Sequence, residues 1–273
     1  IDAPVAIRDK PGATDLTVTD GTLSFDHVGF TYDGAAHPTL KDVSFVARKG
    51  QTIGIVGAPG SGKSTLAHLI ARFYDVSEGS IKIDGQDVRD VTLKSLRTSV
   101  AIVQQDTFLF TTTIENNIAY GNPWAKETRI EKAAESAQLH NYIMGLPADY
   151  DTVVGERGVS LSGGQRQRLS IARSLVLKPA VMVFDDSTAA IDAGTEHRIR
   201  SAIRRFAKDR ITIIIAHRLS SLMDADTIFF LEDGAIAERG THDELLALGG
   251  RYRALYDLQT RPTEDIEQQE AGQ

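Results

Sequence analysis

The sequence predicts an α/β fold, because short β-rich runs are mixed with stretches of helical character along the chain. Residues 52–56, 181–184 and 211–215 are continuously apolar, which is typical of central strands in a sheet covered on both faces. The first of these runs is followed by a glycine-rich turn and then by a helical pattern. The other predicted strands are 23–28, 43–47, 81–83, 100–103 and 227–231.

Length and composition limit the class of protein. The 273 residues are enough for one large domain or two small ones, and 41% apolar with 25% charged residues is typical of a globular chain. The absence of cysteine excludes disulfides, thiolate catalysis and Cys-ligated metal sites. A net charge of −7 argues against a general surface for nucleic acid or anionic membranes, so any phosphate site has to be built locally.

The two ends of the chain differ from its middle. Residues 1–20 contain prolines and scattered charges without a sustained period, so we predict a linker entering a domain at 21–260. Residues 261–273 are predicted to be a disordered acidic tail. The first residue is Ile1 rather than Met and no signal segment follows, which favours a fragment or a processed chain.

The middle of the chain contains a long stretch without strand-like runs. No comparable strand occurs in 111–146, whereas 114–119 and 126–144 look helical. We therefore predict a helical subdomain at about 106–175, inserted into the sheet core. The apolar runs of the chain are all far shorter than the roughly 20 residues that span a bilayer.

The glycine-rich turn has the residue types of a phosphate-binding loop. Its glycines let the backbone turn tightly and approach an anion, so that N–H groups and the helix N-terminus can point at phosphates. Lys63 would reach the β- and γ-phosphates and the Ser64 hydroxyl would bind Mg²⁺. The alternative is a chance match in an ordinary turn. The predicted nucleotide-binding residues of this loop are Gly57, Gly60, Ser61, Gly62, Lys63, Ser64 and Thr65.

Two carboxylates follow the apolar run at 181–184. Asp185 is suited to hold Mg²⁺ through water, and Asp186 to face the water that attacks the terminal phosphate. Without the loop at 57–65 a surface turn would be an equally good interpretation. With that loop in the same chain, a nucleotide site is favoured.

A second glycine-rich helix start occurs at Leu161-Ser162-Gly163-Gly164-Gln165. Ser162 can cap the helix and offer its hydroxyl, while the two glycines leave the N–H groups of the first turn open to an anion. Because the loop at 57–65 already accounts for one nucleotide, this second helix start indicates a site shared between two chains. Ordinary helix capping is the alternative.

These motifs, in this order, resemble the nucleotide-binding domain of an ATP-binding cassette (ABC) transporter over nearly all of residues 20–260. The resemblance implies the ABC ATPase fold: a P-loop NTPase core of the RecA type with an antiparallel β subdomain and an inserted helical subdomain. It also implies ATP and Mg²⁺ as cofactors and ATP hydrolysis as the activity. The motifs that resemble the family's Walker A, Q-loop, signature, Walker B, D-loop and H-loop are 57–65, Gln105-Asp106, 161–165, Asp185-Asp186, 189–192 and His217.

The resemblance implies further roles for single residues. Tyr32 would stack on adenine, although a buried strand-end aromatic is the alternative. Gln105 would complete the Mg²⁺ and water environment together with Ser64 and Asp185, with its neighbour Gln104 leaving the register open. Asp192 would contact the partner chain. His217 would contact the γ-phosphate and orient the attacking water.

Two segments resemble exporter-type cassettes in particular, namely 151–158 and 240–246, for which charged surface loops are the alternative. In such exporters a membrane domain usually precedes the cassette in one chain, so the resemblance implies a transmembrane partner and a location on the cytoplasmic side of the cell membrane. The competing classes are a soluble ABC-type ATPase of DNA repair or translation and an importer cassette. The former normally carry coiled coils, zinc modules or a second cassette, none of which is apparent in the sequence.

One position departs from the family pattern, because Asp186 stands where the family usually has Glu. The carboxylate is drawn back by about 1.5 Å, and a displacement of about 1 Å can cost on the order of 10²-fold in rate. Nucleotide binding should survive, whereas hydrolysis in this site is in doubt. A heterodimeric exporter that pairs this weak site with a competent one fits the substitution. A slow homodimer stays open, because His217 is retained.

Overall fold

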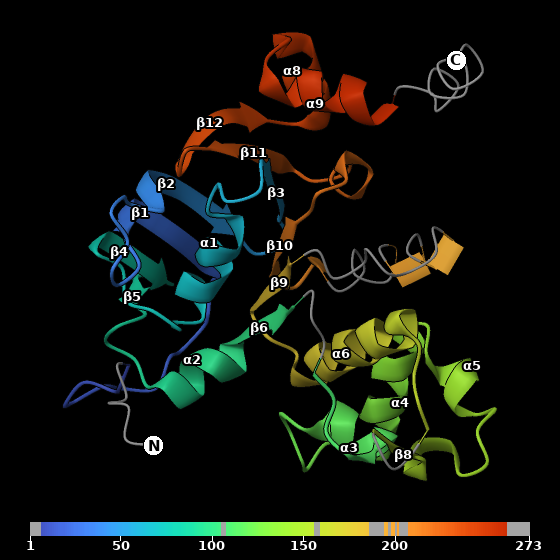
Figure 1. Ribbon diagram of the computed structural model, residues 1–273. Helices are drawn as coiled ribbons and strands as arrows, with labels where there is room; N and C mark the ends of the chain where they lie inside the picture. The colour runs from blue at the N-terminus through green and yellow to red at the C-terminus, as the bar shows by residue number, and fades with distance from the viewer. Residues whose placement is uncertain are drawn as a thin grey trace, which may run out of the picture.

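The computed structural model describes residues 7–104, 108–155, 159–185, 194–195, 198–199, 201 and 207–260. Its main sheet has six strands in the order β12-β11-β3-β10-β9-β6. Figure 1 shows this sheet between an antiparallel sheet on one side and a group of helices on the other. The strands of the main sheet are β3 (Thr52–Gly57), β6 (Val100–Val103), β9 (Val181–Asp185), β10 (Ile211–Ile215), β11 (Thr227–Glu232) and β12 (Ala235–Gly240).

The main sheet confirms the α/β fold class and the prediction that its apolar strands are covered on both faces. β3, β6, β9, β10 and β11 pair in parallel, and β12, which the sequence analysis missed, is antiparallel to β11 at the edge. In β9, Val181 and Val183 belong to one hydrophobic cluster, while Met182 and Phe184 belong to another on the opposite face. Continuous apolarity therefore reflects two cores that share one sheet.

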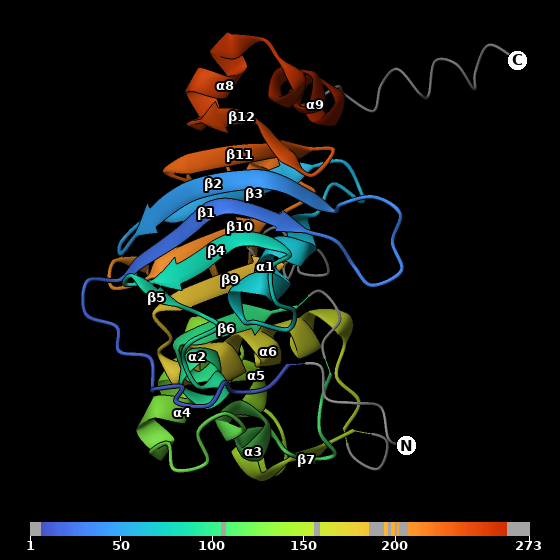
Figure 2. The ribbon, with the colours of Figure 1, turned by 90° about the vertical axis from the view of Figure 1, so that its left-hand side faces the viewer.

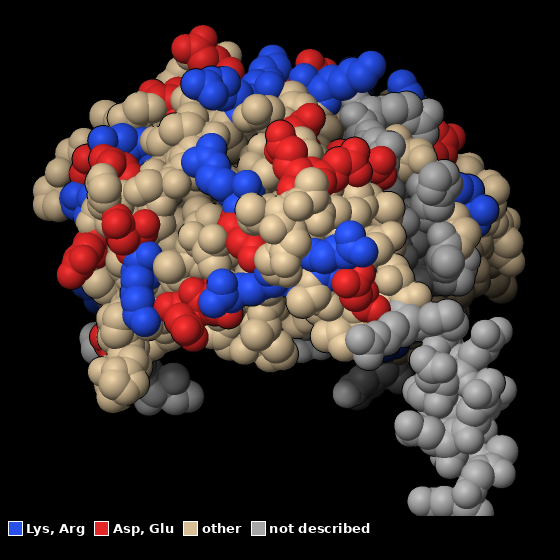
Figure 3. Space-filling view, turned by 90° about the horizontal axis from the view of Figure 1, so that it is seen from above, with Lys and Arg blue, Asp and Glu red and all other residues tan. Residues whose placement is uncertain are grey.

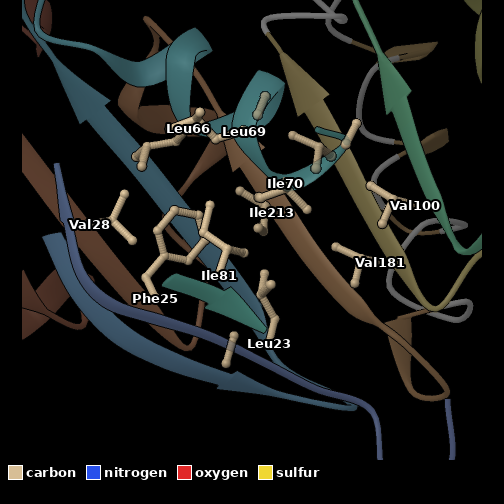
Figure 4. Packing of buried hydrophobic residues seen from close by; sticks show 14 of the residues in the cluster. Leu23, Phe25, Val28, Leu66, Leu69, Ile70, Ile81, Val100, Val181 and Ile213 are labelled. Atoms are coloured by element: carbon tan, nitrogen blue, oxygen red, sulfur yellow. The ribbon is translucent and has the colours of Figure 1, made fainter. Parts of the chain in front are cut away.

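The first core lies between the main sheet and an antiparallel sheet of order β2-β1-β4-β5. The helix that follows β3, α1 (Lys63–Ile70), is buried between them (Figures 1 and 4). Figure 4 shows Leu66, Leu69 and Ile70 of α1 packed among apolar side chains of both sheets. The four strands are β1 (Thr22–Phe30), β2 (Leu40–Arg48), β4 (Glu78–Ile83) and β5 (Gln86–Asp87), and α2 (Leu93–Ser99) leads from them to β6.

The second core joins β6 and β9 to a group of helices. The stretch predicted to be helical at 126–144 contains two helices, separated by a turn in which Gln138 adopts a left-handed conformation, with φ of 56°. A two-stranded sheet at 112–113 and 153–154 also joins this group. The elements are β7 (Thr112–Thr113), α3 (Ile114–Ala119), α4 (Glu127–Ser136), α5 (His140–Ile143), η1 (Asp149–Asp151), β8 (Val153–Val154) and α6 (Gly163–Leu177).

The third core covers the remaining part of the main sheet with the C-terminal helices, α8 (His242–Leu248) and α9 (Arg251–Thr260). The short η2 (Leu219–Ser221) packs there too, through Leu219. Figure 3 views the molecule from above, on the side where Figure 1 places α8 and α9, and shows both signs of charge interspersed. In the part of the chain that the structure describes, no helix is long and apolar enough to cross a bilayer.

The described part of the N-terminal segment, residues 7–20, is attached to the domain. The carboxylate of Asp84, between β4 and β5, accepts hydrogen bonds from the N–H groups of Thr19 and Gly21 at 2.7 and 3.1 Å. Thr22 adds its N–H and its hydroxyl to the same carboxylate. In Figure 2 this segment runs along the edge of the molecule past β5 and α2. Its function as a linker stays a prediction.

Asp84 is expected to make stability depend on acid pH. Partial burial acts to raise the pKa of its carboxyl, but the N–H groups of Thr22, Thr19 and Gly21 and the Thr22 hydroxyl outweigh burial and lower the pKa from 3.8 to about 2. Asp84→Asn, which also tolerates the left-handed φ of 48°, should cost about 1–2 kcal/mol of unfolding free energy at neutral pH, after allowance for partial exposure.

Because the folded-state pKa lies below the unfolded one, this contribution is present above about pH 4 and disappears as the pH falls through 3.8 toward 2. Urea unfolding at pH 7 and at decreasing pH measures it. Asp42→Asn is the matched control, since Asp42 also has a positive φ, of 50°, and pairs only with the exposed His27 among the described residues. A cost for Asp84→Asn that does not change with pH would contradict the assignment.

Candidate functional site

Several of the predicted site residues lie at one edge of the main sheet because its strands are parallel. In the register of the pairs, Gly57 lies opposite Leu231, Ile55 opposite Ile215, and Ile215 opposite Asp185. Three predicted parts of the site therefore lie at the carboxyl ends of neighbouring strands. They are the phosphate loop after β3, Asp185 at the end of β9, and the segment after β10 that contains His217. In open α/β sheets this is the edge at which ligands bind.

The phosphate loop comes close to β11 where it leaves β3. A Cβ atom added at Gly57 would lie 2.2 Å from the Leu231 carbonyl oxygen and 2.8 Å from Ser61 Oγ. At Gly62, which precedes α1 with φ of 98°, a Cβ atom would lie 2.6 Å from Leu40. Side chains at these two positions would push the loop away from the sheet, whereas Gly60 has open space around it.

Lys63, the first residue of α1, is held inside this loop. Its side chain is buried, and Nζ donates hydrogen bonds to the carbonyl oxygens of Gly57 and Ala58 at 2.9 and 2.8 Å. Ser61 Oγ is also buried and has no hydrogen-bond partner within the described residues. A buried ammonium group and an unsatisfied hydroxyl at a helix N-terminus fit an anionic group such as a phosphate.

The residues predicted to bind Mg²⁺ fit that ion in their chemistry. Ser64 is exposed in the first turn of α1, Asp185 ends β9, and α1 packs against β9. A hydroxyl and a carboxylate supply hard oxygen ligands, and Mg²⁺ normally completes its shell with phosphate and water. Gln105 and Asp186 lie outside the described residues, as does Asp192.

Tyr32, the predicted adenine contact, lies beside the phosphate loop and also packs against the first core. Its hydroxyl is 3.0 Å from the hydroxyl of Thr65 in α1. Its half-buried ring meets Phe30 and Tyr74 edge-on, with centroid separations of 4.7 and 5.2 Å. Tyr74, 42% exposed, is an aromatic neighbour of Tyr32 that the sequence analysis did not single out, and nothing in its local pattern distinguishes it.

His217 is exposed and follows β10 by two residues. Its backbone carbonyl accepts a hydrogen bond from the side chain of Gln259 in α9. The sequence analysis missed Gln259, because an exposed glutamine near a helix end carries no signal that a sequence pattern can reveal. This contact joins the end of β10 to an element more than forty residues further along the chain.

The second glycine-rich helix start belongs to the helical side of the molecule and is not part of the loop–sheet edge just described. Ser162 and Gln165 form a capping box: Ser162 Oγ accepts from the Gln165 N–H, and Gln165 Oε1 accepts from the Ser162 N–H at 2.8 Å. Gly163 and Gly164 form the first turn of α6, and Ser162 is exposed. Capping thus accounts for Ser162 and Gln165 in a single chain. The predicted contact of Ser162 with a nucleotide shared between two chains requires a second chain.

The two segments that resemble exporter cassettes differ in how fully the structure describes them. Residues 156–158 of the first lie outside the described residues. In the second, Thr241 and Glu244 form another capping box, at the start of α8. Helix capping therefore accounts for Thr241 and Glu244 of that segment, and His242 Nδ1 lies 2.7 Å from the Tyr252 hydroxyl.

Fold and site together define a P-loop nucleotide-binding domain, and the comparisons give its family. The family model for ABC transporters matches residues 40–189, more than half of the chain. The chain belongs to the ABC transporter family. Together with its relatives and its structural neighbour, this makes it a nucleotide-binding domain of the exporter type.

The relatives are longer than this chain. A Staphylococcus aureus protein, named as a multidrug export ATP-binding/permease protein, is 46% identical over 95% of this chain and 45% of its own length. ATP-binding cassette sub-family B member 6 from Mus musculus is 44% identical over 98% of this chain and 32% of its own.

Among solved structures, a bacterial Atm1-family ABC exporter with ATP bound matches with a TM-score of 0.90 and 46% identity, over 94% of this chain and 45% of that chain. The chain thus spans less than half the length of these relatives.

Gly57→Ala is expected to damage the phosphate loop, because the new Cβ would overlap a backbone oxygen that only a shift of β3 or β11 can move away. We expect a loss of about 2 kcal/mol in unfolding free energy and weaker binding of Mg-ATP. Gly60→Ala is the control, since it shares a positive φ but meets no atom within 4 Å. Urea unfolding compares the two variants, and an equal loss of unfolding free energy would contradict the steric argument. Fluorescence titration compares Mg-ATP binding by Gly57→Ala with the wild type, since Gly60 is itself a predicted nucleotide-binding residue.

Proposed function

We propose that this chain binds and hydrolyses ATP and thereby powers export by a membrane transporter. The observation that carries the proposal is the phosphate loop with its buried Lys63, placed at the same sheet edge as Asp185 and the start of the His217 segment. The family membership and the exporter relatives support it. Loop glycines and Lys63 would hold the phosphates, and Tyr32 would contact the adenine.

Hydrolysis places demands on several residues at this edge. Negative charge on the γ-phosphate would be met by Lys63 and by N–H groups of the loop. Ser64 and Asp185, with Gln105, would hold Mg²⁺, which neutralises phosphate charge when bound. Asp186 and His217 would orient the attacking water and accept its proton.

The exposed helix start of α6 supports a head-to-tail dimer. Ser162 and the N–H groups of Gly163 and Gly164 would contact the γ-phosphate of the ATP held by a partner cassette, with Gln165 supporting the turn through its capping bond. ATP would then hold two cassettes together. Hydrolysis and phosphate release would let them separate, which the membrane domains would follow.

The partner cassette is proposed to be a different chain. Asp186 is shorter than the Glu usual in the family, so this chain's own site would hold ATP with little turnover. Its signature segment, which is complete, would serve the competent site of the partner.

The helical side carries a surface suited to a membrane-domain partner on the cytoplasmic side of the membrane. Large apolar side chains of this helical side are exposed, and we take this exposed apolar surface as the contact with that partner. Arg173 contacts two of these residues: it donates a hydrogen bond to the carbonyl oxygen of Phe108 and lies over the ring of Tyr120, and it also donates to the carbonyl oxygen of Asn117. Burial lowers the pKa of Arg173. The exposed residues are Phe108, Tyr120, Trp124, Met144 and Val153.

The competing classes are less well supported. The relatives named above are exporters or sub-family B cassettes, which does not favour a DNA-repair or translation ATPase or an importer cassette. Interspersed charge on the face seen in Figure 3 likewise gives no basic field for nucleic acid there.

Lys63→Ala is expected to abolish measurable Mg-ATP binding or turnover, because it removes the buried cation that the phosphate loop holds through the carbonyl oxygens of Gly57 and Ala58. Lys49→Ala, at an exposed position in the turn before β3, is the control and should bind as wild type. Titration with a fluorescent ATP analogue and a phosphate-release assay measure the effects. Unchanged binding and turnover in Lys63→Ala would contradict the assignment.

Asp186→Glu is expected to raise ATPase activity about 10- to 100-fold above a near-zero wild-type rate, because the longer side chain moves the carboxylate toward the water. Steady-state ATP turnover is measured against protein concentration. Asp185→Glu is the matched control, and its ATPase activity should not rise above that of the wild type. Activity that rises faster than linearly with concentration supports a dimer. Robust wild-type turnover would instead favour the homodimer and overturn the weak-site proposal.

A further inference from the structure

One side chain of α9 holds the segment that follows β10 at two points. Gln259 Nε2 donates to the carbonyl oxygen of His217 at 2.7 Å, and Gln259 Oε1 accepts from the N–H of Leu219 at 2.9 Å. The two bonds enclose the backbone on either side of Arg218. A primary amide is needed for this pattern, because it presents one donor and one acceptor in the same plane.

The helix that carries Gln259 is itself fixed at its other end. Both oxygens of the Glu238 carboxylate in β12 accept N–H groups at the start of α9, from Arg251 and Tyr252. The Tyr252 ring is fully buried, and its hydroxyl is 2.7 Å from His242 Nδ1 in α8. The N-terminus of α9 is therefore tied to the main sheet by way of β12.

The segment held by Gln259 is short and packed on one side. Leu219 is 2% exposed and belongs to the same core as Tyr252, while His217 is exposed. Between the end of β10 and Leu219 only Ala216, His217 and Arg218 intervene. With β10 fixed in the sheet and Leu219 fixed in the core, the two bonds from Gln259 determine the peptide orientation at His217.

We propose that Gln259 is a positioning residue for His217 in ATP hydrolysis. The inference rests on the proposed role of His217. By fixing the backbone on both sides of Arg218, Gln259 sets the Cα–Cβ direction of His217 and so the place of its imidazole at the carboxyl edge of the sheet. The C-terminal helix α9, although far along the sequence from the nucleotide-binding motifs, thereby helps to position His217.

The test compares Gln259→Ala, which loses both bonds, with Gln259→Glu, which keeps the acceptor for Leu219 but opposes a carboxylate to the His217 carbonyl. Thr260→Ala is the matched control, since its hydroxyl donates to the Tyr256 carbonyl oxygen within α9 and to no other group among the described residues. Turnover and KM for Mg-ATP are measured in the wild-type and Asp186→Glu backgrounds, and thermal unfolding verifies the fold. We expect kcat to fall about 10-fold or more in both Gln259 variants with KM changed less than about 3-fold, and Thr260→Ala to match its parent.

A double-mutant cycle separates positioning from structure. Gln259→Ala combined with His217→Ala should be no slower than His217→Ala alone, because both changes act through one imidazole. In NMR spectra of histidine-labelled protein, the His217 signal, identified as the one lost in His217→Ala, should move in Gln259→Ala and stay in place in Thr260→Ala.

The outcomes distinguish the proposed role of His217 in hydrolysis from the positioning role of Gln259. If His217→Ala in the Asp186→Glu background keeps the turnover of its parent, the role of His217 is wrong and the positioning role of Gln259 is overturned with it. If His217→Ala is slow but Gln259→Ala behaves like Thr260→Ala, or its effect adds to that of His217→Ala, only the inference about Gln259 is overturned.

Discussion

The parallel pairing of five strands is the constraint on which the rest of this structure depends. It brings the ends of β3, β9 and β10 to one edge, although these strands lie far apart in the sequence. It also requires that both faces of the sheet be covered, and three hydrophobic clusters do so. Ile214 packs against two of these clusters, so the segment that leads to His217 is supported from both of them. The relative positions of the site residues thus depend more on how the main sheet pairs and packs than on the local structure of the loops.

Much of this fold could be predicted because its signals are local. β6 and β10 begin and end at the predicted residues, and the phosphate loop was recognised from its glycines and lysine. The break between α4 and α5 was missed, because Gln138 adopts a left-handed φ that composition does not encode. β12 was missed for a similar reason: its pattern is partly polar, and it becomes a strand by pairing with β11 at the sheet edge.

The residues of the candidate site also differ in whether a local sequence signal could predict them. Lys63 and Ser64 are predicted from the glycine-rich loop, Asp185 from the end of an apolar strand, and Tyr32 from the family resemblance. The structure brings them to one region around α1 and the sheet edge. Gln259 could not be predicted, because its importance comes from two backbone contacts 40 and 42 residues away. Ser162 shows the opposite case, in which a single-chain structure accounts for a residue by capping and leaves its proposed partner contact to experiment.

The close approach of Gly57 to Leu231 has a consequence for the order of assembly. The Thr52 N–H is bonded to the side chain of Asp226, so the start of β3 also depends on a residue 174 positions later. During synthesis, β3 can acquire neither β10 nor β11 until most of the chain has left the ribosome, and pairing over such separations is slow. The nucleotide site is therefore among the last parts of the domain to take shape, even though its defining loop is among the first to be made.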